Sequence, residues 1–386
     1  MRFSRRTGWA TSPNRIASKL QELRERGEPF LDLTESNPTR CGFSYLDPEL
    51  LEAFRDPANL TYAPDPRGLL KAREAVCAYY ARKGIAVEPE QVFLTANTSE
   101  AYGFIFRLLA DPGDGLLAPK PSYPLFDYLA GLHDAELIPY PLSYDGRWTV
   151  DWAPLEADIP ATCKGLILVN PNNPTGNYME GAARTRLRDF CLTRNLALVC
   201  DEVFLDYPLQ SGRAPASFAG ETETLTFTMS GISKILGLPQ MKISWIVVSG
   251  PGPERVEALR RLEVIADTYL SAGTPPQNAL PAWFRSQPAI TGEILDRVRG
   301  NYAAARDEKG PLRFLAAEGG WYTVAPLPQG RHDEEWVLEL LERDRVFVHP
   351  GYFFDFEGGD YAVVSLLPEP SVFREGLDRL ASRLRG

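Results

Sequence analysis

Short apolar runs alternate with longer amphipathic stretches through the middle of the chain. Seven runs are apolar nearly throughout, at residues 91–95, 115–118, 136–140, 165–169, 196–200, 224–228 and 244–248. Helical spacing of apolar residues lies between several of them, at 99–109, 124–131 and 181–194. Apolar strands separated by helices are typical of a mainly parallel sheet covered on both faces. The pattern therefore predicts an α/β fold with a large domain built on a mainly parallel seven-stranded sheet.

The two ends of the chain show a different pattern. Residues 13–27 have the spacing of an amphipathic helix that ends at Gly27. After a long predicted helix at 255–269, further helices come first and short strands follow, near 321–325, 346–349 and 361–366. A last helix is expected at 371–385. This order favours a smaller α/β domain to which both ends of the chain contribute.

Three segments follow from this change of pattern. We expect residues 1–40 to join the small domain, residues 41–275 to form the large domain, and residues 276–386 to form the rest of the small domain. In a parallel sheet, ligand-binding residues gather on the loops at the carboxyl ends of the strands. The polar residues of this chain that are unusual for their surroundings lie on such loops.

Composition excludes several classes of protein. The 386 residues are 44% hydrophobic and 24% charged, which is ordinary for a soluble globular protein. A net charge of −10 argues against nucleic acid or an anionic membrane surface as a partner. No apolar run approaches the roughly 18 residues of a membrane helix, and no signal peptide is visible. The expected location is the cytoplasm.

Cysteine and histidine are too sparse to suggest a metal centre. The five cysteines are scattered without C-x-x-C spacing, so we expect neither a zinc site nor a disulfide framework. Such cysteines are typical of buried positions in a reducing compartment. With only three histidines, acid–base chemistry must fall to other groups. No metal is expected.

Lys234 lies in an unusual polar stretch. Ser230 and Ser233 precede it, and a second lysine, Lys242, follows eight residues later beyond a Gly-Leu-Pro turn. An amine among hydroxyl groups, with another cation nearby, suits a phosphorylated carbonyl compound. The amine can bond to the carbonyl carbon, while the second cation and the hydroxyls hold the phosphate. Taken alone, such a string is most often a solvated loop.

Two further loops carry polar residues directly after predicted strands. Asn173 lies in Asn-Pro-Asn-Asn-Pro-Thr-Gly, a rigid turn that can point an amide at a ligand oxygen. Asp201 follows an apolar strand, where a partly desolvated carboxylate is tolerated if it pairs with a cation such as a protonated ring nitrogen. The simpler readings are a plain loop for Asn173, and a helix cap or a surface salt bridge for Asp201.

The ends of two more predicted strands are followed by candidate ligand-binding residues. Thr98 and Ser99 begin a predicted helix, where first-turn N–H groups and hydroxyls can bind a phosphate. An ordinary helix cap explains them equally well. Tyr123 follows another strand and can stack on a flat ring, although a core tyrosine is the simpler interpretation. Each of these features has an ordinary explanation by itself, so the functional interpretation depends on their occurring together.

The combination resembles a known family. The Ser-x-x-Ser-Lys segment, Asn-Pro-Asn-Asn-Pro-Thr-Gly and Asp-Glu-Val occur in the order and spacing of fold-type I, pyridoxal-phosphate-dependent aminotransferases of class I/II, the aspartate aminotransferase superfamily. The likeness covers the chain from Leu31 to the last predicted helix. It implies pyridoxal 5'-phosphate as the cofactor, bound by the large domain. It implies transfer of an amino group between an amino acid or amine and a 2-oxo acid.

The resemblance also assigns roles. Lys234 matches the lysine that forms the aldimine with the cofactor and moves the substrate proton, and Asp201 the carboxylate that keeps the pyridine nitrogen protonated. Asn173 matches the donor to the ring oxygen, and Tyr123 the stacking aromatic. The phosphate would be held by residues that match the family's phosphate-binding positions: Thr98, Ser99, Lys242, and either Ser230 or Ser233. Tyr62 matches a tyrosine that reaches the neighbouring subunit's phosphate, which implies a homodimer.

Three departures from the family's pattern touch the cofactor. Phe204 stands where a tyrosine is usual, so one donor to the ring oxygen is absent. A hydrogen bond to a charged group is worth roughly 1.5–3 kcal/mol, and we expect a shifted aldimine pKa rather than lost activity. Gly231 stands where a hydroxyl residue is usual, three positions before Lys234. Lys242 replaces a phosphate-binding arginine and loses its two-pronged geometry.

Other departures touch the substrate. Val363 stands where the family has an arginine that clamps the substrate carboxylate, and Ser36 stands where glycine is frequent. The resemblance places Ser36, Asn173 and Trp321 among the substrate-binding residues. Loss of the clamp leaves a second reading open, a lyase, decarboxylase or biosynthetic enzyme that acts on an atypical amine with the same cofactor. A non-catalytic regulator is a third reading, disfavoured by the retained lysine and aspartate.

Overall fold

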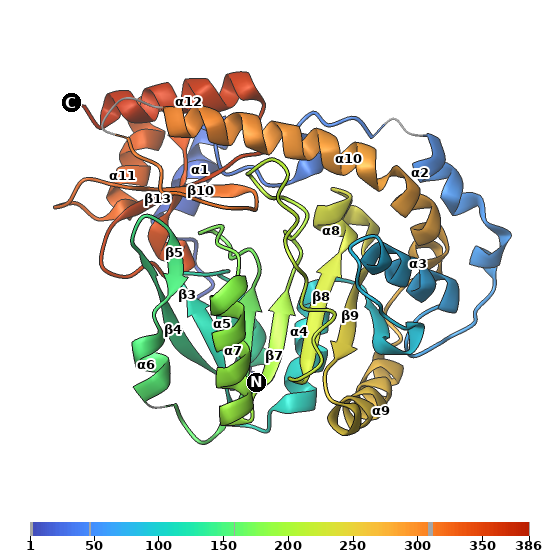
Figure 1. The fold of residues 1–386 in the computed structure, drawn as a ribbon. Helices are drawn as coiled ribbons and strands as arrows, with labels where there is room; N and C mark the ends of the chain where they lie inside the picture. The colour runs from blue at the N-terminus through green and yellow to red at the C-terminus, as the bar shows by residue number, and fades with distance from the viewer. Residues whose placement is uncertain (1–2, 46–47, 158, 308–311, 386) are drawn as a thin grey trace.

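An eight-stranded sheet forms the centre of the protein (Figure 1). The computed structural model describes residues 3–45, 48–157, 159–307 and 312–385. The strand order is β2-β9-β8-β7-β6-β3-β4-β5. The bounds are β2 (Val92–Thr95), β3 (Gly115–Lys120), β4 (Glu136–Tyr144), β5 (Trp148–Val150), β6 (Cys163–Val169), β7 (Ala197–Asp201), β8 (Thr226–Gly231) and β9 (Ser244–Ser249).

The prediction of a mainly parallel sheet is confirmed. Strands β4, β3, β6, β7 and β8 pair in parallel, whereas β9 is antiparallel to both of its neighbours. All seven predicted strands are present. The prediction missed β5, a three-residue edge strand antiparallel to β4, because three residues are too few to show a period.

Helices cover both faces of this sheet. On one face, Phe104 of α4 and Leu262 of α9 pack with Ile167 of β6. On the other face, Leu187 of α7 packs with Leu166 and other strand residues. The helices of the first 270 residues are α1 (Arg15–Glu25), α2 (Pro48–Glu52), α3 (Leu70–Ala81), α4 (Thr98–Leu109), α5 (Phe126–Leu132), α6 (Trp152–Ala157), α7 (Gly181–Arg194), α8 (Ile232–Ile235) and α9 (Gly252–Tyr269).

One long helix, α10 (Thr274–Asp307), stands where the sequence predicted several. It continues through Pro281 and Pro288, although proline removes a helix hydrogen bond. Its buried side chains, such as Trp283 and Ile294, belong to the largest apolar core of the protein. In Figure 1 it runs along the upper side of the molecule from the large sheet to α12, with which it is in contact. Packing along its length therefore outweighs the two prolines.

A second group of strands lies at the other end of α10. Strand β13 (Tyr361–Ser365) pairs with β10 (Tyr322–Pro326) and β12 (His349–Pro350), and helices α11 (Asp333–Glu339) and α12 (Pro370–Arg383) accompany them. Near the start of the chain, β1 (Leu31–Asp32) pairs in parallel with β11 (Val346–Phe347). This pairing supports our proposal that residues 1–40 join residues 276–386 in a small domain. None of the described helices is long and apolar enough to cross a membrane.

Candidate active site

A cavity of about 270 Å³ lies where strands β6 and β7 end and α8 begins. Its wall contains seven of the residues that the sequence predicted for the site: Ser36, Thr98, Tyr123, Asn173, Asp201, Ser233 and Lys234. Four further residues complete it: Val169, Val203, Phe204 and Tyr322. The register of the sheet explains part of this gathering, since Val169 at the end of β6 pairs with Asp201 at the end of β7. Ser36 and Tyr322 come from the segments outside the large sheet.

Lys234 lies on the four-residue helix α8, directly after β8. Its Nζ is 5.1 Å from the centre of the Trp321 ring and 5.5 Å from that of Phe204. The hydroxyl of Tyr207 donates a hydrogen bond of 2.5 Å to the backbone oxygen of Lys234 and fixes the turn. Burial lowers the pKa of the Lys234 amine to about 8, against the attraction of Asp201, which raises it. A neutral, nucleophilic amine is therefore accessible near physiological pH.

Asp201 is a buried carboxylate with two hydrogen-bond donors. It is the last residue of β7 and only 8% exposed. Its Oδ1 accepts from the backbone N–H of Val203 at 3.1 Å, and its Oδ2 accepts from the hydroxyl of Tyr102 at 3.1 Å. Burial raises the pKa of this carboxyl to about 6, while the two donors and Lys234 oppose the rise. Asp201 is thus suited to pair with a cation inside the cavity.

The turn that carries Asn173 is held by its own side chains. Asn172 donates from Nδ2 to Thr175 Oγ1 at 2.7 Å and to the backbone oxygen of Pro121 at 3.0 Å. Asn173 lines the cavity, and its Oδ1 is buried without a hydrogen-bond partner among the described residues. An unpaired buried polar atom costs free energy, so a ligand group in the cavity would stabilise this side chain.

The start of α4 and Tyr123 complete the wall. Asn97 caps α4 by accepting from the backbone N–H of Glu100 at 2.9 Å, so the helix begins at Thr98 in the cavity. The first-turn N–H groups of a helix attract an anion. The Tyr123 ring meets Phe126 edge-on at 5.7 Å, and burial raises the pKa of its hydroxyl to about 12. Tyr123 therefore presents a neutral, fixed aromatic ring.

The family model "Aminotransferase class I and II" matches residues 29–368 of the chain. The chain belongs to this family. Among curated proteins it is 26% identical over 378 residues to the glutamate-pyruvate aminotransferase of Haemophilus influenzae, covering 95% of this chain and 93% of that one. It is 27% identical over 376 residues to the LL-diaminopimelate aminotransferase of Dehalococcoides mccartyi, covering 95% and 94%. The protein is therefore an aminotransferase, and the comparisons do not favour the lyase or decarboxylase reading.

Solved structures share the fold. The alanine aminotransferase of Pyrococcus furiosus has a TM-score of 0.89 at 22% identity, with all of both chains covered. The aspartate aminotransferase of Thermotoga maritima has a TM-score of 0.85 at 20% identity, again over both whole chains. These likenesses confirm the predicted α/β architecture.

Five predicted site residues of this aminotransferase lie outside the cavity wall: Tyr62, Ser99, Ser230, Lys242 and Trp321. Ser230 is buried inside β8, and its hydroxyl donates to the backbone oxygen of Glu202 at 3.4 Å, whereas Ser233 lines the cavity. Lys242 is exposed, in a left-handed turn after Met241. The geometry therefore favours Ser233 over Ser230 as the phosphate hydroxyl and gives Lys242 no contact with this cavity.

On the side of the cavity where the substrate is expected, Tyr322 takes the place that the sequence predicted for Trp321. Trp321 is fully buried behind Lys234, and its neighbour Tyr322 lines the cavity instead. Strand alternation from Trp321 could have indicated this, because adjacent residues of a strand face opposite sides. Burial raises the pKa of the Tyr322 hydroxyl, and the nearby Ser36 side chain opposes that rise. The aminotransferase thus brings two hydroxyl groups together at this wall.

Val363 lies in an apolar cluster. It is fully buried with Val324 and Phe354, and it pairs with Val324 across strands β13 and β10. Among the described residues that line the cavity, Lys234 is the only one with a basic side chain. The absence of an arginine at position 363 is therefore not offset by another cation in the described cavity wall.

Gly231 departs from the family's pattern for a steric reason. A Cβ at this position would lie 2.2 Å from Ser244 Oγ and 3.1 Å from the Ser244 backbone. Strands β8 and β9 pair Gly231 directly with Ser244. The close approach of the two strands leaves no room for a side chain here, so the hydroxyl must come from elsewhere.

Proposed function

We propose that this aminotransferase uses pyridoxal 5'-phosphate to move an amino group between an amino acid or amine and a 2-oxo acid. Bound in this cavity, the cofactor supplies an aldehyde that bonds to amines and a protonated ring that withdraws electrons from the substrate Cα. One observation carries the proposal. The cavity wall joins a buried amine, Lys234, to a buried carboxylate, Asp201, and burial shifts the pKa values of both towards neutrality.

The residues of the wall fit the cofactor. Asp201 offers a negative charge for the protonated ring nitrogen, and Asn173, which lines the cavity, can donate from its amide nitrogen to the ring oxygen. Tyr123 offers a flat ring for stacking. The phosphate is assigned to the α4 N-terminus with Thr98, and to Ser233. Each of these groups binds or orients the ring and leaves the Lys234 amine to carry the proton at the substrate Cα.

Neutral groups are proposed to hold the substrate. Ser36, Tyr322 and Asn173 reach the cavity, and none of them carries a charge at neutral pH. Trp321 is reassigned from a substrate contact to the packing behind Lys234, because it is fully buried. We expect weaker anchoring of the substrate carboxylate than a two-pronged arginine would give.

The test is a panel of amino donors and 2-oxo acids with the purified protein and added pyridoxal phosphate. Glutamate with pyruvate, and LL-diaminopimelate with a series of 2-oxo acids, are tested first, because the relatives named for glutamate and pyruvate and for LL-diaminopimelate are about equally similar. We expect absorbance above about 400 nm or at about 330–360 nm, and formation of the matching 2-oxo acid. A protein that stays colourless with added cofactor contradicts the proposal, and release of ammonia or CO₂ instead of a 2-oxo acid supports the lyase or decarboxylase reading.

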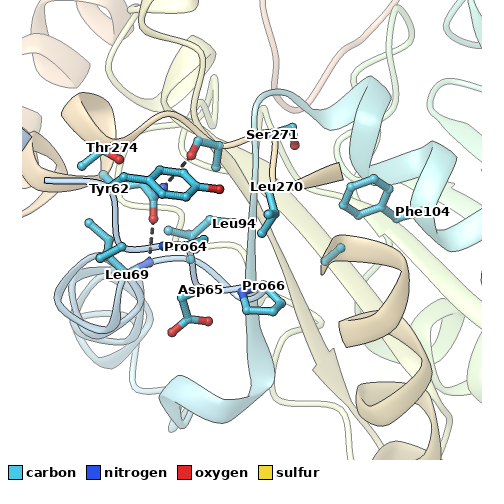
Figure 2. A pocket seen from close by; sticks show the side chains of 15 residues that line it. Tyr62, Pro64, Asp65, Pro66, Leu69, Leu94, Phe104, Leu270, Ser271 and Thr274 are labelled. Atoms are coloured by element: carbon cyan, nitrogen blue, oxygen red, sulfur yellow. Dashed lines mark hydrogen bonds between the residues drawn. The ribbon is translucent and has the colours of Figure 1, made fainter. Parts of the chain in front are cut away.

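We also propose a homodimer in which Tyr62 reaches the neighbouring subunit's site. Tyr62 is 79% exposed and lies beside a hollow that Leu69, Phe104 and Leu270 help to line (Figure 2). Large exposed apolar side chains occur on the same segments, among them Leu60 at 92% exposed. Gathered exposed apolar side chains are typical of a protein interface. The cytoplasm remains the proposed location, in keeping with the five free cysteines.

A hybrid dimer tests the shared site. Tyr62→Phe and Lys234→Ala subunits are unfolded together and refolded as a mixture. If Tyr62 acts across the interface, the hybrid has one site with both native residues. These sites add about a quarter of wild-type activity to what the parental dimers in the mixture retain, since half the dimers are hybrids with one such site each. Activity no higher than the mean of the two parents would contradict the shared site. Tyr128→Phe, an exposed tyrosine of α5, is the control.

A further inference from the structure

Tyr102 is a buried tyrosine whose hydroxyl reaches the cavity carboxylate from behind. It is 1% exposed and lies on α4, four residues after Thr98. Its hydroxyl donates to Asp201 Oδ2 at 3.1 Å. Residues four apart share one face of a helix. One face of α4 therefore reaches the cavity through Thr98 and contacts Asp201 through Tyr102.

The direction of this hydrogen bond is fixed by the environment. Burial raises the pKa of the Tyr102 hydroxyl well above its ordinary value, and the charge of Asp201 raises it further. The proton therefore stays on the tyrosine, and the carboxylate is the acceptor. A donor to the charged form of a carboxyl favours that form. Tyr102 thus opposes the burial that raises the pKa of Asp201.

The ring of Tyr102 is held in place by aromatic neighbours. Phe126 meets it edge-on at 5.3 Å between centroids, and Phe106 lies at 5.8 Å. The second donor to Asp201, the backbone N–H of Val203, lies on the other carboxylate oxygen. With one donor on each oxygen, the carboxylate cannot turn freely about its last bond.

We propose that Tyr102 is a positioning residue that keeps Asp201 ionised and aimed at the ring nitrogen of the cofactor. The proposal rests on the proposed role of Asp201 and adds a residue that touches neither cofactor nor substrate. Tyr102 has no place in the cavity wall, so its effect passes through Asp201. The same helix would then set the distance between the phosphate end, at Thr98, and the nitrogen end of the bound ring.

The test compares Tyr102→Phe with Tyr140→Phe. Both tyrosines are 1% exposed, and Tyr140 donates to the backbone oxygen of Ile167 at 2.8 Å, a bond with no charged partner. Binding of pyridoxal phosphate to the cofactor-free protein is measured by fluorescence between pH 5 and 8. We expect Tyr102→Phe to weaken binding about tenfold or more at neutral pH, because a bond to a charged group is lost. The loss of binding at low pH should move to higher pH by about one unit.

The same two substitutions in an Asp201→Asn background separate the proposed role of Tyr102 from the proposed role of Asp201. If Tyr102 acts through the charge of Asp201, Tyr102→Phe has about the same small effect as Tyr140→Phe once that charge is gone. The positioning role would be overturned if Tyr102→Phe weakened cofactor binding as much in the Asp201→Asn background as in the native protein. A wild-type pH dependence of binding in Tyr102→Phe would overturn it as well. If Asp201→Asn alone leaves cofactor binding and spectrum unchanged, it is the proposed role of Asp201 that fails.

Discussion

Replacing Lys234 with alanine is expected to reduce amino transfer by about four orders of magnitude or more, because one side chain performs two tasks. In the proposed function its amine bonds to the cofactor, and the same amine moves the proton at the substrate Cα. The cavity supplies no substitute, since Lys234 is the only basic residue in its described wall. Single-turnover absorbance measurements and product assays on the cofactor-loaded variant would measure the loss.

Lys242→Ala is the matched control for this substitution. Lys242 is the other lysine of the same segment, but it is exposed and outside the cavity wall. We expect near-wild-type cofactor affinity and turnover. A large loss of cofactor affinity in Lys242→Ala would restore the sequence-based assignment of Lys242 to the phosphate and would contradict the site described above.

The pH dependence of cofactor capture gives an independent check on Lys234. A neutral amine attacks an aldehyde and a protonated one does not. Since burial lowers the pKa of Lys234 to about 8, the rate at which cofactor-free protein takes up pyridoxal phosphate should rise with pH and level off above that value. An unperturbed lysine, with a pKa of about 10.4, would give a rate still rising at pH 9.

The strands and the main site residues could be predicted because they follow local rules. Apolar runs bounded by turns marked the seven strands, and polar residues directly after them marked Asn173, Asp201 and Thr98. Parallel pairing of β6 and β7 brings Asn173 and Asp201 to one edge of the sheet. Strand β2 is antiparallel to β9, which is itself antiparallel to β8, so β2 ends at the same edge and brings Thr98 there. The continuity of helix α10 could not be predicted, because its prolines favour a break and only packing along the length of the helix overrides them.

Other site residues depend on contacts between distant parts of the chain. Tyr322 enters the cavity because β10 pairs with β13, and Tyr102 reaches Asp201 across 99 positions of sequence. No spacing rule links such pairs. The choice between Ser230 and Ser233 likewise depended on where β8 ends, since Ser230 lies inside the strand and Ser233 on the helix after it. Local pattern identified the chemistry, and tertiary pairing selected the residues.

Replacing Asp201 with asparagine should have the second largest effect, a fall in turnover of about a hundredfold to a thousandfold with little change in fold. The substitution keeps the shape but removes the charge that we propose to pair with the ring nitrogen, and loss of one partner of a buried ion pair costs about 3–5 kcal/mol. Cofactor affinity and the bound cofactor's absorbance should change with turnover, because the same pair holds the ring and keeps it protonated.

Glu202→Gln is the control that isolates the charge at position 201. Glu202 is the next residue, is 1% exposed, and accepts from Ser217 Oγ at 2.5 Å and from the Phe218 backbone N–H at 2.7 Å, away from the cavity wall. Burial raises its pKa to about 7, so glutamine imitates a form that the native protein already populates near neutrality. If Glu202→Gln impaired cofactor binding as strongly as Asp201→Asn, loss of a buried carboxylate at this strand end would suffice to explain both, and the ion pair with the ring would lose its support. Normal binding in Glu202→Gln beside a large loss in Asp201→Asn assigns the effect to Asp201, the carboxylate of the described cavity wall.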